Sequence, residues 1–96
     1  MSVDLGKFVD DSAGIYAELQ QILVAKQKDY GPHNIAGAPG GPINGLLVRM
    51  NDKLERVKNL YYTSSEPQNE PLEDSFVDLA NYAVICLMVQ RGKWPA

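Results

Sequence analysis

The chain has 96 residues, of which 45% are hydrophobic, and a formal net charge of −3. This composition argues against intrinsic disorder and against a dedicated nucleic-acid-binding surface, which usually carries a basic excess. The single cysteine excludes an internal disulfide and a zinc site made of cysteines.

The apolar segments are too short to serve as targeting or membrane-spanning sequences. The first eleven residues, MSVDLGKFVDD, lack the basic and apolar regions of a signal peptide. The longest apolar run, Phe76–Val89, is interrupted by Asp78 and cannot span a bilayer. We therefore expect a cytoplasmic protein without a membrane partner. Because a chain this short encloses only a modest core, we also expect a homo-oligomer, most simply a dimer, that buries part of the first or last helix.

The first predicted helix covers residues 12–28. Its apolar residues recur at the spacing of one helical face, and they are Ile15, Tyr16, Leu19, Ile22 and Leu23. Gly31 and Pro32 are a strong stop signal. A further, broken helix near the N-terminus is an open alternative.

The rest of the chain predicts a glycine- and proline-rich loop and two more helices. Residues 31–45 hold five glycines and three prolines, so we expect an irregular segment, either functional or a flexible spacer. Helical periodicity then covers residues 46–62 and, after a polar turn, residues 71–91. No segment alternates like a strand. The sequence predicts a single all-α domain over residues 1–96, a small bundle of three main helices with the last helix the most buried.

Two aspartates on the last helix are the first candidates for chemistry. Asp74 and Asp78 are four residues apart and share one face of a helix that is apolar nearly all round. At about 6 Å and an effective dielectric near 20, their repulsion is about 2–3 kcal/mol. A raised pKa, a basic partner or a divalent cation must relieve it. The alternative is that the helix dipole favours them near the N-terminus, more plausibly for Asp74 than for Asp78.

The second predicted helix carries a basic strip beside its apolar stripe. Arg49, Lys53 and Arg56 lie along one flank, with Asp52 just beyond. Such a strip can bind phosphate oxygens, since guanidinium groups engage them bidentately. The alternative is a solvated flank with weak pairs between residues three or four apart, such as Asp52 with Arg56.

The end of the first helix offers a third group. Lysines at 26 and 28 are explained by the helix dipole. Tyr30, between an Asp and a Gly that lead into the loop, is a candidate for stacking on a base.

Three blocks of the sequence resemble the phage-enriched family called nucleotide modification associated domain 1. They are Lys28-Asp29-Tyr30-Gly31, Arg49-Met50-x-Asp52-Lys53-x-x-Arg56 and Asp74-x-x-x-Asp78-Leu79-Ala80-Asn81-Tyr82-Ala83. The resemblance covers about residues 15–92 and keeps the order of the family's blocks. The third block is also similar to the metal-binding helix of the all-α nucleotide pyrophosphatases, the MazG-like and dimeric dUTPase-like enzymes. A MazG-like helical bundle is the fold this implies.

The resemblance implies a Mg²⁺-dependent pyrophosphohydrolase acting on a nucleoside triphosphate (NTP or dNTP), or a related nucleotide-metabolising protein. The carboxylates expected to hold Mg²⁺ are Asp74, Asp78 and Asp52, with Glu55 as a further ligand. The residues expected to bind the nucleotide are Lys28, Tyr30, Asn34, Arg49, Lys53, Arg56 and Asn81.

Two other hypotheses stay open. Those pyrophosphatases typically carry a Glu three residues before the metal-binding Asp, whereas this chain has Ser75 there. This difference favours a protein that binds, sequesters or senses a nucleotide without turnover. The third hypothesis is a purely structural helical oligomer, in which the charged residues set the register of the partners.

Overall fold

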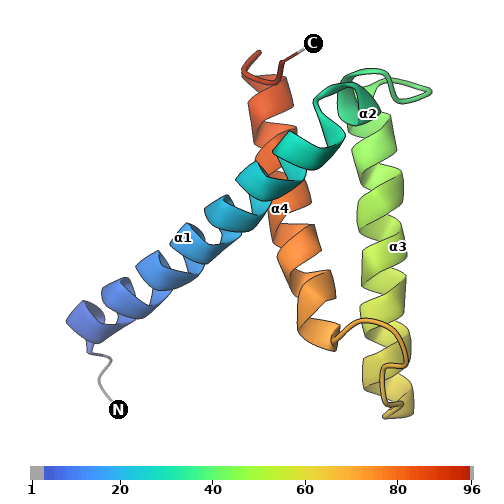
Figure 1. The fold of residues 1–96 in the computed structure, drawn as a ribbon. Coiled ribbons are helices and arrows are strands. Elements are labelled where there is room, and N and C mark those ends of the chain that lie inside the picture. Colours follow the sequence, from blue (N-terminus) through green and yellow to red (C-terminus); the bar gives the residue numbers. More distant parts are fainter. Residues whose placement is uncertain (1–3, 96) are drawn as a thin grey trace.

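A computed structural model describes residues 4–95, and these residues form four helices and no strand (Figure 1). The helices are α1 (Leu5–Tyr30), α2 (His33–Ala36), α3 (Pro42–Thr63) and α4 (Leu72–Gln90). The all-α prediction is therefore confirmed for the described residues. None of these four helices combines the length and the hydrophobicity that spanning a bilayer requires.

Helix α1 begins at Leu5, well before the predicted residue 12. Asp4 caps it, because its side chain accepts a hydrogen bond from the backbone N–H of Lys7 at 3.0 Å. Residues 5–11 therefore continue one unbroken helix, and the alternative of a separate, broken helix is wrong. The helix ends as predicted at Gly31, whose positive φ of 68° favours glycine.

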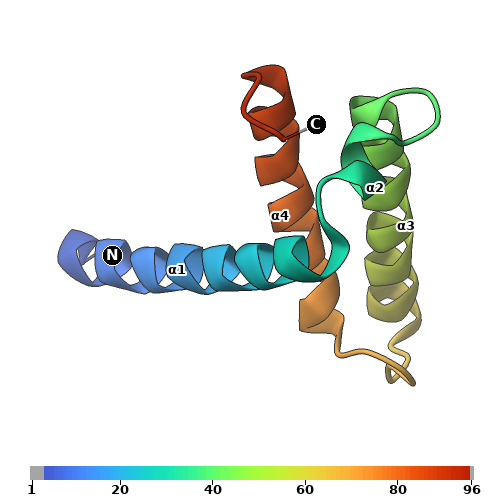
Figure 2. The same cartoon turned by 45° about the horizontal axis from the view of Figure 1, so that its top comes forward.

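The glycine- and proline-rich segment is shorter and more ordered than predicted. Figure 2 shows the chain passing from α1 through the single turn of α2 to the start of α3. Helix α3 begins at Pro42, not at residue 46, because proline suits the first turn of a helix, where its missing N–H costs nothing. The prediction of an irregular segment throughout residues 31–45 is therefore wrong at both α2 and the start of α3.

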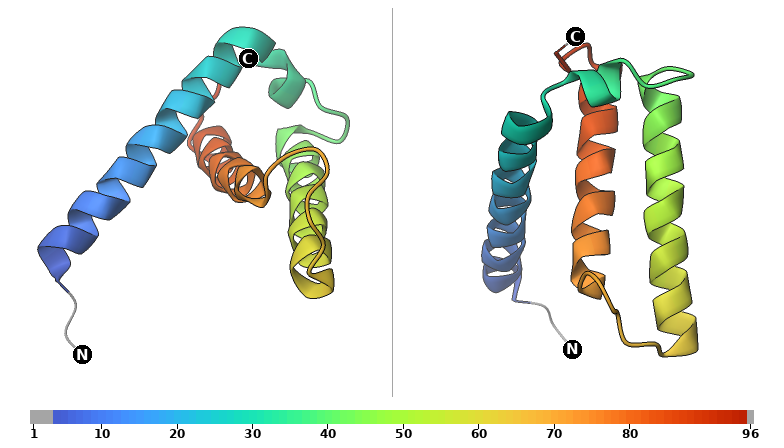
Figure 3. Two further views of the ribbon diagram at one scale, coloured as in Figure 1. Left: turned by 60° about the horizontal axis from the view of Figure 1, so that its bottom comes forward. Right: turned by 45° about the vertical axis from the view of Figure 1, so that its right-hand side comes forward.

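The helices meet along α4, which lies between α1 and α3 (Figure 3). Helix α4 packs antiparallel to α3 over most of its length, and α1 touches it less extensively (Figure 1). The buried apolar core of the described residues is small: Ile35, Leu46 and Ile85. Helix α4 also buries Ser75 and Asn81, which confirms that the last helix is the most buried.

The core predicts a sharp contrast between two neighbouring leucines of α3. Leu46 is fully buried, whereas Leu47 is 57% exposed. We expect Leu46→Ala to destabilise the protein by about 2–4 kcal/mol through lost burial and the cavity left behind. Leu47→Ala, the matched control, should cost less than about 1 kcal/mol. Urea unfolding followed by circular dichroism measures both, and equal losses would contradict this assignment of the core.

Candidate functional site

A single carboxylate joins the three long helices. Asp78 on α4 accepts a hydrogen bond through Oδ1 from Lys26 on α1 and forms an ion pair through Oδ2 with Lys53 on α3, each at 2.9 Å. The Asp78 side chain is 13% exposed, and the Lys26 side chain is 52% exposed. Lys53 also lies 4.0 Å from the carboxylate of Glu70, so two cations and two carboxylates meet at this point.

The ion pairs fix the charge states of the group. Burial by itself would raise the pKa of Asp78, but the hydrogen bonds from Lys26 and Lys53 outweigh it and leave that pKa below its ordinary value. The hydrogen bond to Asp78 raises the pKa of Lys26, and the same holds for Lys53. All three groups are therefore charged at neutral pH.

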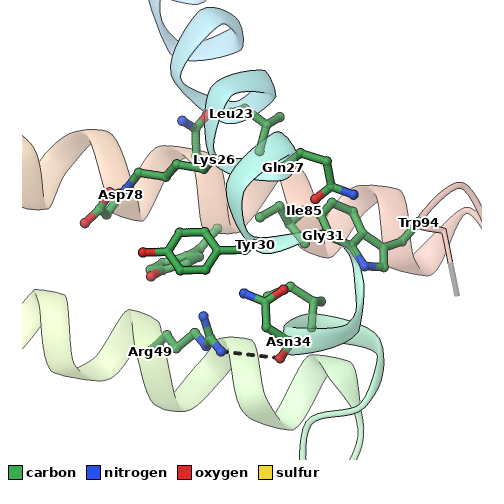
Figure 4. A pocket seen from close by; sticks show the side chains of 13 residues that line it. Leu23, Lys26, Gln27, Tyr30, Gly31, Asn34, Arg49, Asp78, Ile85 and Trp94 are labelled. Atoms are coloured by element: carbon green, nitrogen blue, oxygen red, sulfur yellow. Dashed lines mark hydrogen bonds and ion pairs between the residues drawn. The ribbon is translucent and has the colours of Figure 1, made fainter.

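A cavity of about 180 Å³ opens beside Asp78. It is bounded by α1, α2, α3, α4 and residues 91–95, which we call the C-terminal turn, and Figure 4 shows side chains from these elements around it. Its lining combines aromatic rings, amides and charges: Leu23, Lys26, Gln27, Tyr30, Gly31, Asn34, Ile35, Arg49, Asp78, Asn81, Tyr82, Ile85 and Trp94. The two cations and the one carboxylate in this set give the cavity a net positive charge.

Local hydrogen bonds hold the walls of this cavity. Arg49 donates to the backbone oxygen of Asn34 at 3.3 Å, as Figure 4 shows, and so links α3 to α2. The indole N–H of Trp94 donates to the oxygen of Pro32 at 3.1 Å, which folds the C-terminal turn back over α2. Asn81 donates through Nδ2 to Leu19 at 3.1 Å. The buried Oδ1 of Asn81 has no hydrogen-bond partner among the described residues.

Arg56 makes its hydrogen bonds within the protein, and its surroundings do not suit phosphate binding. Its guanidinium donates to the hydroxyl of Ser75 at 2.6 Å and to the backbone oxygens of Glu70 and Pro71. It therefore ties α3 to the first turn of α4, where Ser75 is fully buried. Because its guanidinium makes these contacts, Arg56 does not offer its donors to a ligand. This differs from the prediction, made from the sequence, that Arg56 binds the nucleotide.

The other predicted residues are dispersed. Asp52 and Glu55 are exposed on α3, and Glu55 pairs with Lys58 at 3.2 Å. Lys28 is exposed in the last turn of α1 and does not line the cavity. Asp74 is exposed in the first turn of α4, where the helix dipole accounts for it.

These positions bear on the predicted magnesium site. Among residues 4–95, no group of three His, Cys, Asp or Glu side chains stands close enough to hold one metal ion. Both oxygens of Asp78 are engaged by lysines. Asp52 and Glu55 are exposed on α3. In this arrangement neither oxygen of Asp78 is free for a Mg²⁺ ion, which proteins usually hold through one or two carboxylates and several waters.

Of the predicted set, the structure brings Tyr30, Asn34, Arg49, Asp78 and Asn81 to one cavity, with Lys53 behind Asp78. Sequence reasoning missed the roles of Lys26, Tyr82 and Trp94. The signal for Lys26 was its position four residues before Tyr30, on the same face of α1. Trp94 follows the last helix, and no local pattern places it against Pro32.

The Asp78 ion pairs predict a measurable contribution to stability. Replacing the carboxylate with an amide leaves two lysines without their anion, so we expect Asp78→Asn to lower the free energy of unfolding by about 1–2 kcal/mol at pH 7. The exposed Asp74→Asn is the matched control and should change it by less than about 0.5 kcal/mol. Urea titrations of both variants measure this. An Asp78→Asn protein as stable as wild type would show that the pairs do not support the fold.

The same ion pairs determine the direction in which stability changes with pH in the acid range. The lowered pKa of Asp78 means that its contribution is present above the unfolded carboxyl pKa of about 3.9 and is lost as the pH falls through the folded value. Wild type should therefore lose more stability than Asp78→Asn on acidification below about pH 4. Parallel acid profiles of the two proteins would contradict this.

Comparison with known proteins assigns most of the chain to a family. Residues 26–89 match the family described as nucleotide modification associated domain 1. No curated protein and no solved structure matches the chain. The likeness to MazG-like pyrophosphatases thus stays a prediction. The matched segment is well over half of the chain and contains Lys26, Lys53 and Asp78. The protein belongs to the nucleotide modification associated domain 1 family.

Proposed function

We propose that this protein binds a nucleotide in the cavity beside Asp78. The observation that carries the proposal is that one cavity combines cationic side chains with aromatic rings and amides. A nucleotide needs both kinds of contact, because its phosphate is an anion and its base is a flat, polar ring. The description of the family, which refers to nucleotide modification, points to the same class of ligand.

The phosphate would lie between Lys26 and Arg49. Both line the cavity, and Figure 4 shows Lys26 on the α1 side and Arg49 on the α3 side. The guanidinium of Arg49 makes one hydrogen bond, to the oxygen of Asn34, and no ion pair to a described residue. It therefore keeps donors for phosphate oxygens, which guanidinium groups bind well. Lys26 is shared with Asp78, which Lys53 also binds, and Lys53 in turn lies 4.0 Å from Glu70.

The base would lie against the aromatic side of the cavity. Tyr30 is 68% exposed and borders the opening, and Tyr82 and Trp94 also line the cavity. Aromatic rings stack on bases of any identity. Asn81 adds a polar contact, because its unpaired Oδ1 is an acceptor that a base N–H could satisfy if the side chain turns.

Binding without turnover is the form of this function that the geometry supports best. Both oxygens of Asp78 hold lysines, and no three of the predicted metal ligands stand together among the described residues. A Mg²⁺-dependent pyrophosphohydrolase is the second candidate. One observation favours it: Glu70, Asp74 and Asp78 line a separate cavity of about 240 Å³ with Lys26. This second candidate requires Lys26 and Lys53 to move away from Asp78.

Titration calorimetry with nucleoside mono- and triphosphates, in EDTA and then in Mg²⁺, tests binding. Pyrophosphate and phosphate release is measured on the same samples. The proposal predicts binding in EDTA and no release. Absence of binding to all nucleotides in both conditions would overturn it. Release that requires Mg²⁺ and is lost in both Asp74→Asn and Asp78→Asn would establish the hydrolase instead.

Arg49→Gln tests the phosphate contact. We expect at least about a tenfold loss of nucleotide affinity, equivalent to about 1.4 kcal/mol, because a charge-assisted contact is removed. The control is Lys28→Gln, which removes one positive charge from the exposed end of α1 outside the cavity. Calorimetry should show near wild-type affinity for that control. Equal losses in both variants would mean that only the overall charge matters.

Tyr30→Ala tests the base contact. Loss of a stacking ring should weaken binding by about 1–3 kcal/mol, and Tyr30→Phe should restore most of it because the ring is kept. Tyr61→Ala is the control, since Tyr61 is 70% exposed on α3 and lies outside the cavity. If inorganic phosphate alone binds as tightly as the nucleotide, the ring contributes nothing and the base contact is refuted.

A further inference from the structure

The single chain leaves far more surface exposed than a compact protein of its size. Its radius of gyration is 15.6 Å, against about 12.5 Å for a compact chain of this length. Its accessible surface is 7214 Å², against about 5,500 Å² for a compact monomer of 10.6 kDa. The excess is about 1,700 Å², which exceeds the roughly 800 Å² that each partner buries in a stable protein–protein interface.

Much of this excess lies on α1. None of the 26 residues of α1 is buried. In its N-terminal half, which diverges from α4 (Figure 3, left), large apolar side chains recur at helical spacing and are more than half exposed. They are Leu5, Phe8, Val9, Ile15 and Tyr16. We call this set the α1 stripe. An isolated helix does not keep such a stripe in water without a partner surface.

An apolar groove continues the α1 stripe toward the rest of the molecule. This groove, between α1, α4 and the C-terminal turn, encloses about 700 Å³. Tyr16 belongs to both the stripe and the groove, and Leu23, Val84 and Met88 form part of the groove's apolar lining. Of the described residues that line it, Lys93 alone is charged. The stripe and the groove therefore form one continuous apolar face.

We propose that a second copy of this chain covers this face. In a twofold dimer, the α1 stripe of each protomer would enter the groove of the other, so that the same contact forms twice. The charges agree with this arrangement. In the projecting half of α1, Lys7 pairs with Asp11 at 2.7 Å and Asp10 leaves a net negative charge, whereas the charged residue in the groove is Lys93. The excess area per chain meets what such an interface needs.

The test compares two tyrosines of nearly equal exposure. Tyr16, in the stripe, is 72% exposed, and Tyr62, on α3, is 76% exposed. Sedimentation equilibrium without nucleotide should give a wild-type mass twice that of the 10.6 kDa chain at micromolar concentration. Tyr16→Glu should raise the dimer dissociation constant at least about 100-fold, because a charge is placed in the apolar interface. Tyr62→Glu should leave it unchanged.

A second variant, on the α4 wall of the groove, tests whether the effect of Tyr16→Glu is only a local change in α1. Val84→Glu changes α4 within the groove, where Val84 is 38% exposed, and it should also give monomers. Circular dichroism establishes that each variant keeps its helices. A monomeric wild type at high micromolar concentration overturns the proposal. A dimer that survives Tyr16→Glu but dissociates in Tyr62→Glu would also overturn it, by assigning the interface to α3.

Discussion

The pairing of Asp78 with Lys26 and Lys53 is the interaction on which the arrangement of the three long helices depends. The described residues bury only three hydrophobic side chains, so apolar packing alone specifies the helix positions weakly. Two ion pairs of 2.9 Å, one to each neighbouring helix, fix α1 and α3 against α4. Because Asp78 is largely enclosed, removing one partner would leave a charge without compensation. The position of α1 in particular depends on Lys26.

Arg56 and Asp78 each take part in a contact that joins α3 to α4. Arg56 binds the hydroxyl of Ser75 and the backbone oxygens just before α4, and thus fixes where the helix begins. One turn further along, Lys53 binds Asp78. Ser75, which differs from the glutamate expected for a MazG-like pyrophosphatase, is thereby explained in structural terms. A carboxylate buried at that position would meet Arg56 rather than a metal ion.

The proposed nucleotide cavity and the proposed dimer face share a wall. Leu23, Gln27, Asn81 and Trp94 line both the cavity and the groove. A second copy in the groove would therefore press on the back of the cavity, where Asn81 has its unpaired oxygen. In this arrangement, assembly of the dimer would order the side chains that contact the base. The proposed dimer would then explain both the small core of the monomer and its open cavity, because one chain alone would form only part of the bundle.

The sequence by itself determined the all-α class, the three long helices and the family, because helical periodicity, proline and glycine signals and short motifs are local properties. It also singled out Asp78, Tyr30 and Arg49. Only the tertiary structure decided which cation each carboxylate meets. Spacing along one helix could not show that Lys26, 52 residues away, would reach Asp78. Nor could it show that Arg56 would bind backbone oxygens or that Trp94 would close the cavity. Such contacts depend on how helices cross and where loops return, and many distant residues set both.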